Sequence, residues 1–118
     1  MLPLNLSVIG ISETWLTSSN KNCYGIPQYT SEHLCRESKR GGGVSLFIKN
    51  GITYKRRSDL EISSPTIECI FIEIEKNSFN SDKNIIVGIV YRPPGTDISV
   101  FMEVFNSLLD LIKKIPIL

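Results

Sequence analysis

A basic run between Arg36 and Arg57 is the group of residues whose type and spacing most directly suggest chemistry. It carries seven lysines and arginines against one acidic residue, a local excess of six positive charges. The whole chain of 118 residues has 13 basic and 12 acidic side chains, so its net charge of +1 does not by itself indicate a nucleic-acid-binding protein. A run of this kind can bind a phosphate backbone, with Lys55, Arg56 and Arg57 as weak nucleic-acid-binding candidates. The alternative, which we favour for the run taken alone, is a solvated hairpin whose lysines protect a strand edge.

The three cysteines, Cys23, Cys35 and Cys69, offer little chemistry of their own. They are widely spaced, odd in number and without a CxxC pair, so neither a zinc site nor a disulfide framework is predicted. This usage favours a reducing compartment, and we expect an intracellular protein, nuclear or cytoplasmic. Residues 1–11 lack the features of a signal peptide and of a membrane span, so no membrane partner is expected.

The elements that would position reactive residues are mainly short strands separated by polar turns. Residues 6–12 are β-branched and nearly all apolar, which predicts a strand buried on both faces that ends at Glu13. Asn50-Gly51 predicts a tight turn that closes a hairpin between residues 44–48 and 52–56. The other predicted strands cover residues 29–34, 67–75 and 85–90, the last of them as a central strand.

A single amphipathic helix is predicted after the last strand. Apolar residues recur at spacings of three and four from Ile98 to Ile112. Thr96 or Asp97 can cap its amino end, and Pro116 ends it. With 42% hydrophobic residues the chain can bury a modest core, and the order of elements predicts an α/β or α+β layered sandwich.

Three segments in this order resemble one family. They are VIGISETWL at residues 8–16, GGGVSLFI at 41–48 and IVGIVYRPP at 86–94, followed by Phe101 in the predicted helix. Together they resemble the endonuclease domain of LINE-type, jockey-like retrotransposons, within the DNase I-like endonuclease/exonuclease/phosphatase superfamily. The resemblance covers almost the whole chain and identifies residues 1–118 as the N-terminal half of such a domain. It implies the α/β fold of a four-layer αββα sandwich, here as a truncated half with a mainly antiparallel sheet and one C-terminal helix.

The resemblance implies a magnesium-dependent endonuclease that nicks target DNA for retrotransposition, with a fused reverse transcriptase as a partner in the parent element. Glu13 matches the carboxylate that holds the catalytic Mg²⁺ in the family. Carboxylate oxygen suits this hard cation, and the cation offsets charge on the scissile phosphate. Without the resemblance, a Glu after a strand would more simply face solvent or cap a turn.

Tyr91 matches a tyrosine that contacts the substrate phosphate in the family. A phenol can donate a hydrogen bond to a phosphate on which charge develops. The alternative for Tyr91 is packing at a sheet edge. Arg92 could also reach a phosphate, although Pro93 and Pro94 would hold it outward.

Three further features are expected to be structural. Gly41–Gly43 is not followed by GK[ST] or by a predicted helix, so the run is expected to set backbone conformation and not to cradle a phosphate. His33, the only histidine, is expected at the surface. Trp15 is expected to pack across the sheet in preference to stacking on a base.

Much of the family's site is expected to be absent. A first strand upstream of Leu6 that carries the family's Asn or Asp, a GDFN-like segment after the helix and an SDH-like segment with the acid/base His are expected to be absent. We therefore expect a fragment that binds Mg²⁺ weakly, lacks a general base and is inactive as this chain. We also expect the second sheet to be missing, which would leave one face of the first sheet uncovered.

Other classes of function stay open on the sequence alone. A binding module could hold nucleic acid through the basic run without cutting it. A degraded transposon copy would have no function. A phosphatase acting on inositol lipids or sphingomyelin ranks last, because the ETWL and YRPP contexts look more like the retrotransposon branch.

Overall fold

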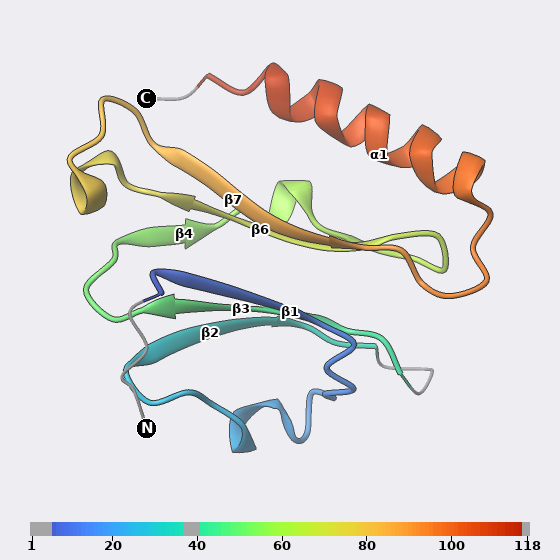
Figure 1. The fold of residues 1–118 in the computed structure, drawn as a ribbon, viewed down its shortest axis with the longest axis horizontal. Coiled ribbons are helices and arrows are strands. Elements are labelled where there is room, and N and C mark those ends of the chain that lie inside the picture. Colours follow the sequence, from blue (N-terminus) through green and yellow to red (C-terminus); the bar gives the residue numbers. More distant parts are fainter. Residues whose placement is uncertain (1–5, 37–40, 117–118) are drawn as a thin grey trace.

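The computed structural model describes residues 6–36 and 41–116, in which two antiparallel sheets stack face to face and one helix covers the outside of the second sheet (Figure 1). Sheet A has the order β1-β3-β2, and sheet B is built around β6, with β4 and β5 along one of its edges and β7 along the other. The strands of sheet A are β1 (Val8–Ser12), β2 (Tyr29–Leu34) and β3 (Val44–Lys49). Those of sheet B are β4 (Tyr54–Arg56), β5 (Ile62–Ser63), β6 (Glu68–Ile74) and β7 (Ile85–Tyr91). The helix is α1 (Ile98–Lys113), and short 3₁₀ turns lie at Lys21–Cys23, Ser58–Leu60 and Lys76–Phe79. The predicted α/β class with antiparallel sheets and one C-terminal helix is confirmed.

The core lies between the two sheets, where β3 and β6 face each other. The alternation predicted for residues 67–75 is confirmed, because Ile70, Ile72 and Ile74 all turn toward sheet A and are fully buried there. On the other face of β6, Phe71 packs with Leu108 of α1. Each such side chain contributes about 1.5–3 kcal/mol by leaving water. β6 therefore packs against sheet A on one face and against α1 on the other.

The Asn50-Gly51 turn forms, but it does not close the predicted hairpin. Gly51 has a φ of +98°, and Ile52 N donates to Lys49 O over 3.2 Å. Both edges of β3 are already paired, with β1 on one side and β2 on the other. The turn therefore carries the chain from sheet A into sheet B, where β4 pairs with β6.

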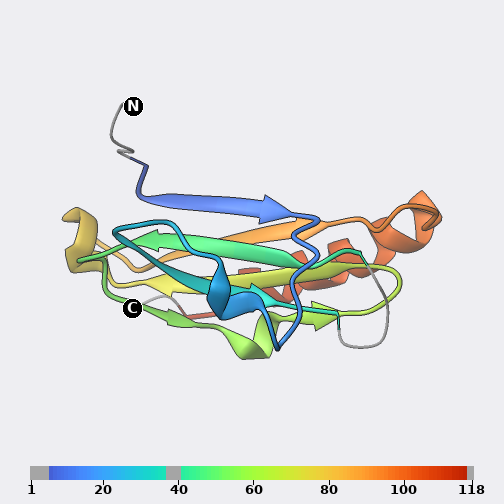
Figure 2. The same ribbon diagram turned by 90° about the horizontal axis from the view of Figure 1, so that it is seen from below.

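β1 and β7 are edge strands. The prediction that β1 is buried on both faces and the prediction that β7 is a central strand are therefore both wrong. β1 ends the strand order of sheet A (Figure 2), and its residues from Gly10 to Ser12 are exposed. β7 was predicted as a central strand, yet it pairs with β6 at the edge of sheet B. Its apolar composition has another cause, because Val87 and Ile89 pack between the sheets while Ile86 and Val90 pack toward α1. A strand can thus be covered on both faces and still lie at an edge.

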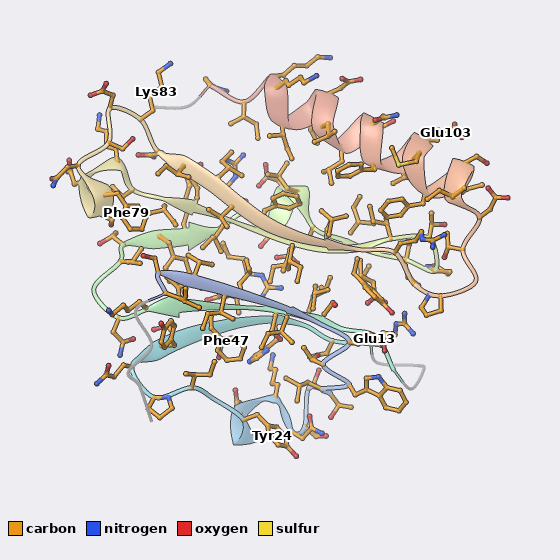
Figure 3. The ribbon with its side chains drawn as sticks, in the orientation of Figure 1. Glu13, Tyr24, Phe47, Phe79, Lys83 and Glu103 are labelled. Atoms are coloured by element: carbon orange, nitrogen blue, oxygen red, sulfur yellow. The ribbon has the colours of Figure 1, made fainter. Side chains whose placement is uncertain are left out.

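The expectation of a missing second sheet and a bare sheet face is also wrong. The inner faces of the two sheets cover each other, α1 covers the outside of sheet B, and the segment before β2 runs beneath sheet A (Figures 1 and 3). His33 and Phe47 lie on that lower face of sheet A, and their rings meet edge to face at a centroid distance of 5.9 Å. His33 is only 9% exposed, so its predicted surface position is wrong. The reason is that its strand register places it beside Ser45 on the covered face.

α1 begins as the sequence predicts. The Asp97 side chain accepts a hydrogen bond from Ser99 N over 2.8 Å and caps the helix. Leu108 is its buried residue, and Phe105 and Ile112 pack against the same cluster. In the described part of the chain, no helix has the length and apolar character that crossing a membrane requires.

Candidate active site

Glu13 and Tyr91 meet at one end of the sandwich. The Tyr91 phenol donates a hydrogen bond to Glu13 Oε1, across a sequence separation of 78 residues. Glu13 directly follows β1, and Tyr91 is the last residue of β7. The two strands lie close together, since a methyl group added at Gly10 would lie 3.3 Å from the Ile89 side chain. The structure thus brings together the two site residues that the motifs single out.

The backbone around Glu13 is held in an uncommon conformation by the glycine run. Glu13 and Trp15 have φ values of +56° and +57°, in the left-handed region that residues other than glycine seldom adopt. Thr14 N donates to Gly43 O over 3.3 Å, and Trp15 N donates to Gly42 O over 2.9 Å. All three glycines of the run also have positive φ. The glycines therefore serve backbone conformation, as predicted, and they do so for the segment that presents Glu13.

An ion pair, Arg36 and Glu68, lies next to Tyr91. Glu68 begins β6 directly opposite Tyr91 and is 2% exposed. Its Oε2 accepts a hydrogen bond from Arg36 Nε, and its Oε1 accepts one from Gly43 N over 2.8 Å. A carboxylate this deeply buried requires such partners.

Sequence reasoning missed the Arg36–Glu68 pair, although one signal was present. Glu68 occupies the same alternating positions as Ile70, Ile72 and Ile74, which form the inward face of β6. A carboxylate on that face needs a buried cation or amide partner. The identity of the partner could not be read from the sequence, because Arg36 lies 32 residues away.

The Tyr91 phenol stays protonated at neutral pH. Partial burial and the adjacent Glu13 carboxylate raise the pKa of Tyr91 to about 12. Arg36 opposes this shift and Glu68 adds to it, so three charged groups, Glu13, Arg36 and Glu68, act on the Tyr91 phenol. The phenol is therefore a hydrogen-bond donor at this site and not a base.

A groove of about 600 Å³ is lined in part by Arg36 and Glu68, whereas Glu13 and Tyr91 are not among its lining residues. It runs between the turn at residues 63–66 and the segment at 93–97, and Thr96 Oγ1 donates to Pro65 O over 3.0 Å between them. The lining mixes hydroxyl groups, prolines and charged side chains, among them Arg36, Ser64, Thr66, Glu68, Pro93 and Asp97. A polar chain with an apolar edge could lie in such a groove.

The basic candidates lie away from this groove. Lys55 and Arg56 belong to β4, which pairs with the far half of β6, and Arg57 follows them. Their positive charge faces carboxylates, since Lys55 lies opposite Glu73 in the ladder. The two arginines form ion pairs, Arg56 with Glu32 and Glu61, and Arg57 with Asp59 and Glu73.

Arg92 and Trp15 are both exposed. Arg92 Nη1 donates to Thr96 O over 3.1 Å, so its guanidinium lies over the turn after Pro93 and Pro94. Trp15 is 54% exposed, with its ring beside Gly41. The expectation that Trp15 packs across the sheet is therefore wrong, because the ring lies beside the glycine run and more than half of the residue is exposed.

Glu13 fits one role in a magnesium site. Mg²⁺ in proteins is commonly held by one or two carboxylates, with water and substrate phosphate as the other ligands. Glu13 is an exposed carboxylate of this kind. Among residues 6–36 and 41–116 no group of three or more His, Cys, Asp or Glu side chains is placed to hold a metal ion.

Comparisons of the chain with protein-family models, with curated proteins and with solved structures found no match.

Proposed function

We propose that Glu13 and Tyr91 are the metal-binding and phosphate-binding residues of a magnesium-dependent endonuclease site, in a DNase I-like domain of LINE type. The observation that carries the proposal is their direct contact, which joins the ends of two strands that are distant in sequence. The substrate is DNA, and a fused reverse transcriptase is the proposed partner in the parent element.

The two side chains have complementary tasks in phosphodiester hydrolysis. The Glu13 carboxylate would hold Mg²⁺, which when bound offsets negative charge on the scissile phosphate. The Tyr91 phenol is protonated and can donate to a non-bridging phosphate oxygen. Before substrate binds, its contact with Glu13 holds the phenol in place. Such preorganisation lowers the cost of ordering the site in the transition state.

A general base for the attacking water is a separate requirement. His33 is the only histidine of the chain, and its Nδ1 is within 2.6 Å of Ser45 Oγ on the covered lower face of sheet A. It does not reach Glu13 or Tyr91. We therefore propose that this chain binds metal and phosphate, and that cleavage needs further residues of an intact domain.

Supercoiled plasmid DNA in the presence of Mg²⁺ tests the proposal. The chain alone is expected to leave the plasmid supercoiled. A fusion to the downstream half of a jockey-like endonuclease domain is expected to nick it, and Glu13→Gln in that fusion to slow nicking about 100-fold or more. Nicking by the chain alone would contradict the need for further residues. Equal nicking by the fusion with and without Glu13→Gln would contradict the role of Glu13.

The binding-module alternative receives less support. It depends on Lys55, Arg56 and Arg57, whose charges are balanced by neighbouring carboxylates. An arginine in such an ion pair gains little free energy when it gives up its carboxylate partner and binds a phosphate instead.

A further inference from the structure

We propose that Arg36 binds a backbone phosphate of DNA at this site, and that Glu68 is the positioning residue that aims it. The inference rests on the proposed function, because its ligand is the nucleic acid whose scissile phosphate would lie at Tyr91. Arg36 is the first residue of the basic run, but it is not among the candidates Lys55, Arg56 and Arg57, and the motifs do not include it.

Glu68 fixes one edge of the Arg36 guanidinium. The carboxylate is almost fully buried, and its two oxygens accept from Arg36 Nε and from Gly43 N. Within the described residues, Nη1 and Nη2 of Arg36 have no hydrogen-bond partner. These two atoms form the end of the guanidinium, which can donate two hydrogen bonds to one phosphate.

Gly42 leaves room for the same guanidinium against the backbone. A Cβ atom built at Gly42 would lie 2.2 Å from Arg36 Nε, 2.3 Å from Cζ and 2.6 Å from Nη2. Only a glycine lets the guanidinium lie this close to the backbone. A guanidinium held on its edge and on its face loses little freedom when a ligand binds.

The position of Arg36 suits a phosphate next to the one at Tyr91. Arg36 lines the 600 Å³ groove, and 22% of its side chain is exposed. Its charge also acts on the Tyr91 phenol. Glu13 and Glu68 would repel a polyanion from this end of the sandwich, and Arg36 offers the opposite charge. The hydroxyl groups of Ser64 and Thr66 line the same groove and could bind further backbone oxygens.

Fluorescence anisotropy of a short labelled DNA duplex tests the inference, with the full chain, constant Mg²⁺ and a series of salt concentrations. Arg36→Gln is expected to weaken binding about tenfold and to reduce the slope of log K against log salt by about 1. Lys83→Gln is the matched control. It removes the same charge from an exposed residue at the opposite end of the molecule from Glu13 (Figure 3).

Glu68→Gln separates positioning from net charge. The substitution removes a negative charge, so simple electrostatics would tighten DNA binding. The inference predicts weaker binding, because the guanidinium loses its ionic anchor. Arg36→Lys keeps the charge without the planar fork, and it is expected to retain the salt slope while losing affinity. If Arg36→Gln does not fold, as judged by its thermal melt, these two variants decide the question.

Binding by Arg36→Gln that equals that of Lys83→Gln would overturn the inference, as would tighter binding by Glu68→Gln. Amide chemical shifts near Glu13 on addition of Mg²⁺ report on the proposed function separately. A retained Mg²⁺ response with DNA binding that is indifferent to Arg36 would refute only the inference. A chain that shows no Mg²⁺ response, yet binds DNA through Arg36, would refute only the metal site.

Discussion

The backbone amide of Trp15 donates a 2.9 Å hydrogen bond to the carbonyl oxygen of Gly42. This bond and its neighbour from Thr14 N to Gly43 O join the segment that presents Glu13 to the glycine run before β3. Glu13, with its left-handed backbone, lies between β1 and these two bonds, which restrain the segment on its carboxyl side. The candidate carboxylate is thus positioned by backbone contacts made across sheet A.

Gly43→Ala should destabilise the fold. Gly43 has a φ of +86°, and an added Cβ would lie 2.7 Å from Thr14 Oγ1 and 3.3 Å from Leu34 O. We expect a loss of about 1–3 kcal/mol in the free energy of unfolding, measured by urea denaturation. Gly25→Ala is the control, because nothing lies within 4 Å of a Cβ there, and its effect should stay within about 0.5 kcal/mol. Equal urea midpoints for Gly43→Ala and Gly25→Ala would show that the fold does not depend on the close contact of Gly43 with Thr14 and Leu34.

Gly88→Ala should loosen the contact between sheet B and the helix. A Cβ at Gly88 would lie 2.2 Å from the ring of Phe71, which packs with Leu108 of α1. Overpacking of this kind costs about 1–3 kcal/mol. In a Phe71→Ala background the same substitution should cost much less, because the ring is gone. Additive effects in this double-mutant cycle would contradict the contact.

The ionisation of Tyr91 should depend on Glu13. The phenol should be half ionised near pH 12, whereas the ordinary value is 10.0, and Glu13→Gln should shift its titration back toward that value. Because the folded pKa is the higher one, the associated stability is present below pH 10 and is lost as the pH rises through the folded value. Assigned NMR signals of labelled tyrosines distinguish Tyr91 from Tyr54, whose pKa is also raised by burial and by Glu32. An unchanged Tyr91 titration in Glu13→Gln would refute the contact in solution.

Mild acid should destabilise the fold through His33. Burial, followed by the charge of Lys21, lowers the pKa of His33 below its ordinary value of 6.5. The unfolded chain therefore binds the proton more readily, so stability is full above pH 6.5 and is lost as the pH falls through the folded pKa. Urea midpoints measured between about pH 7 and pH 5 should fall in the wild type and fall less in His33→Gln. If the urea midpoints of the wild type and of His33→Gln fall in parallel, groups other than His33 control the pH dependence of stability between about pH 7 and pH 5.

The sequence predicts the elements well because their signals are local. The alternation of residues 67–75 and the Asp97 cap each depend on a few neighbouring residues, and both are found. Strand pairing depends on distant segments, which explains the errors. Asn50-Gly51 predicts a turn correctly but cannot show that β1 and β2 already occupy both edges of β3. His33 could not be predicted as buried, since the segment that covers it has no distinctive pattern.

The residues of the candidate site also differ in whether a local sequence signal identifies them. Glu13 and Tyr91 carry motif signals, and the structure brings them together. Arg36 has no signal apart from its charge, and its place is set by Glu68 and Gly42. Arg56 and Arg57 belong to the same basic run as Arg36, yet carboxylates from separate segments neutralise them. Net charge along the chain therefore does not show which cations are available to a ligand.

Proton–nitrogen correlation NMR of the chain during a Mg²⁺ titration tests the metal site most directly. We predict dispersed signals and weak, saturable shifts, in the millimolar range typical of sites with few protein ligands, that concentrate at Glu13 and Tyr91. The same titration of Glu13→Gln should leave those signals unmoved. Shifts that are absent from the wild type, or that persist unchanged in Glu13→Gln, would contradict the account.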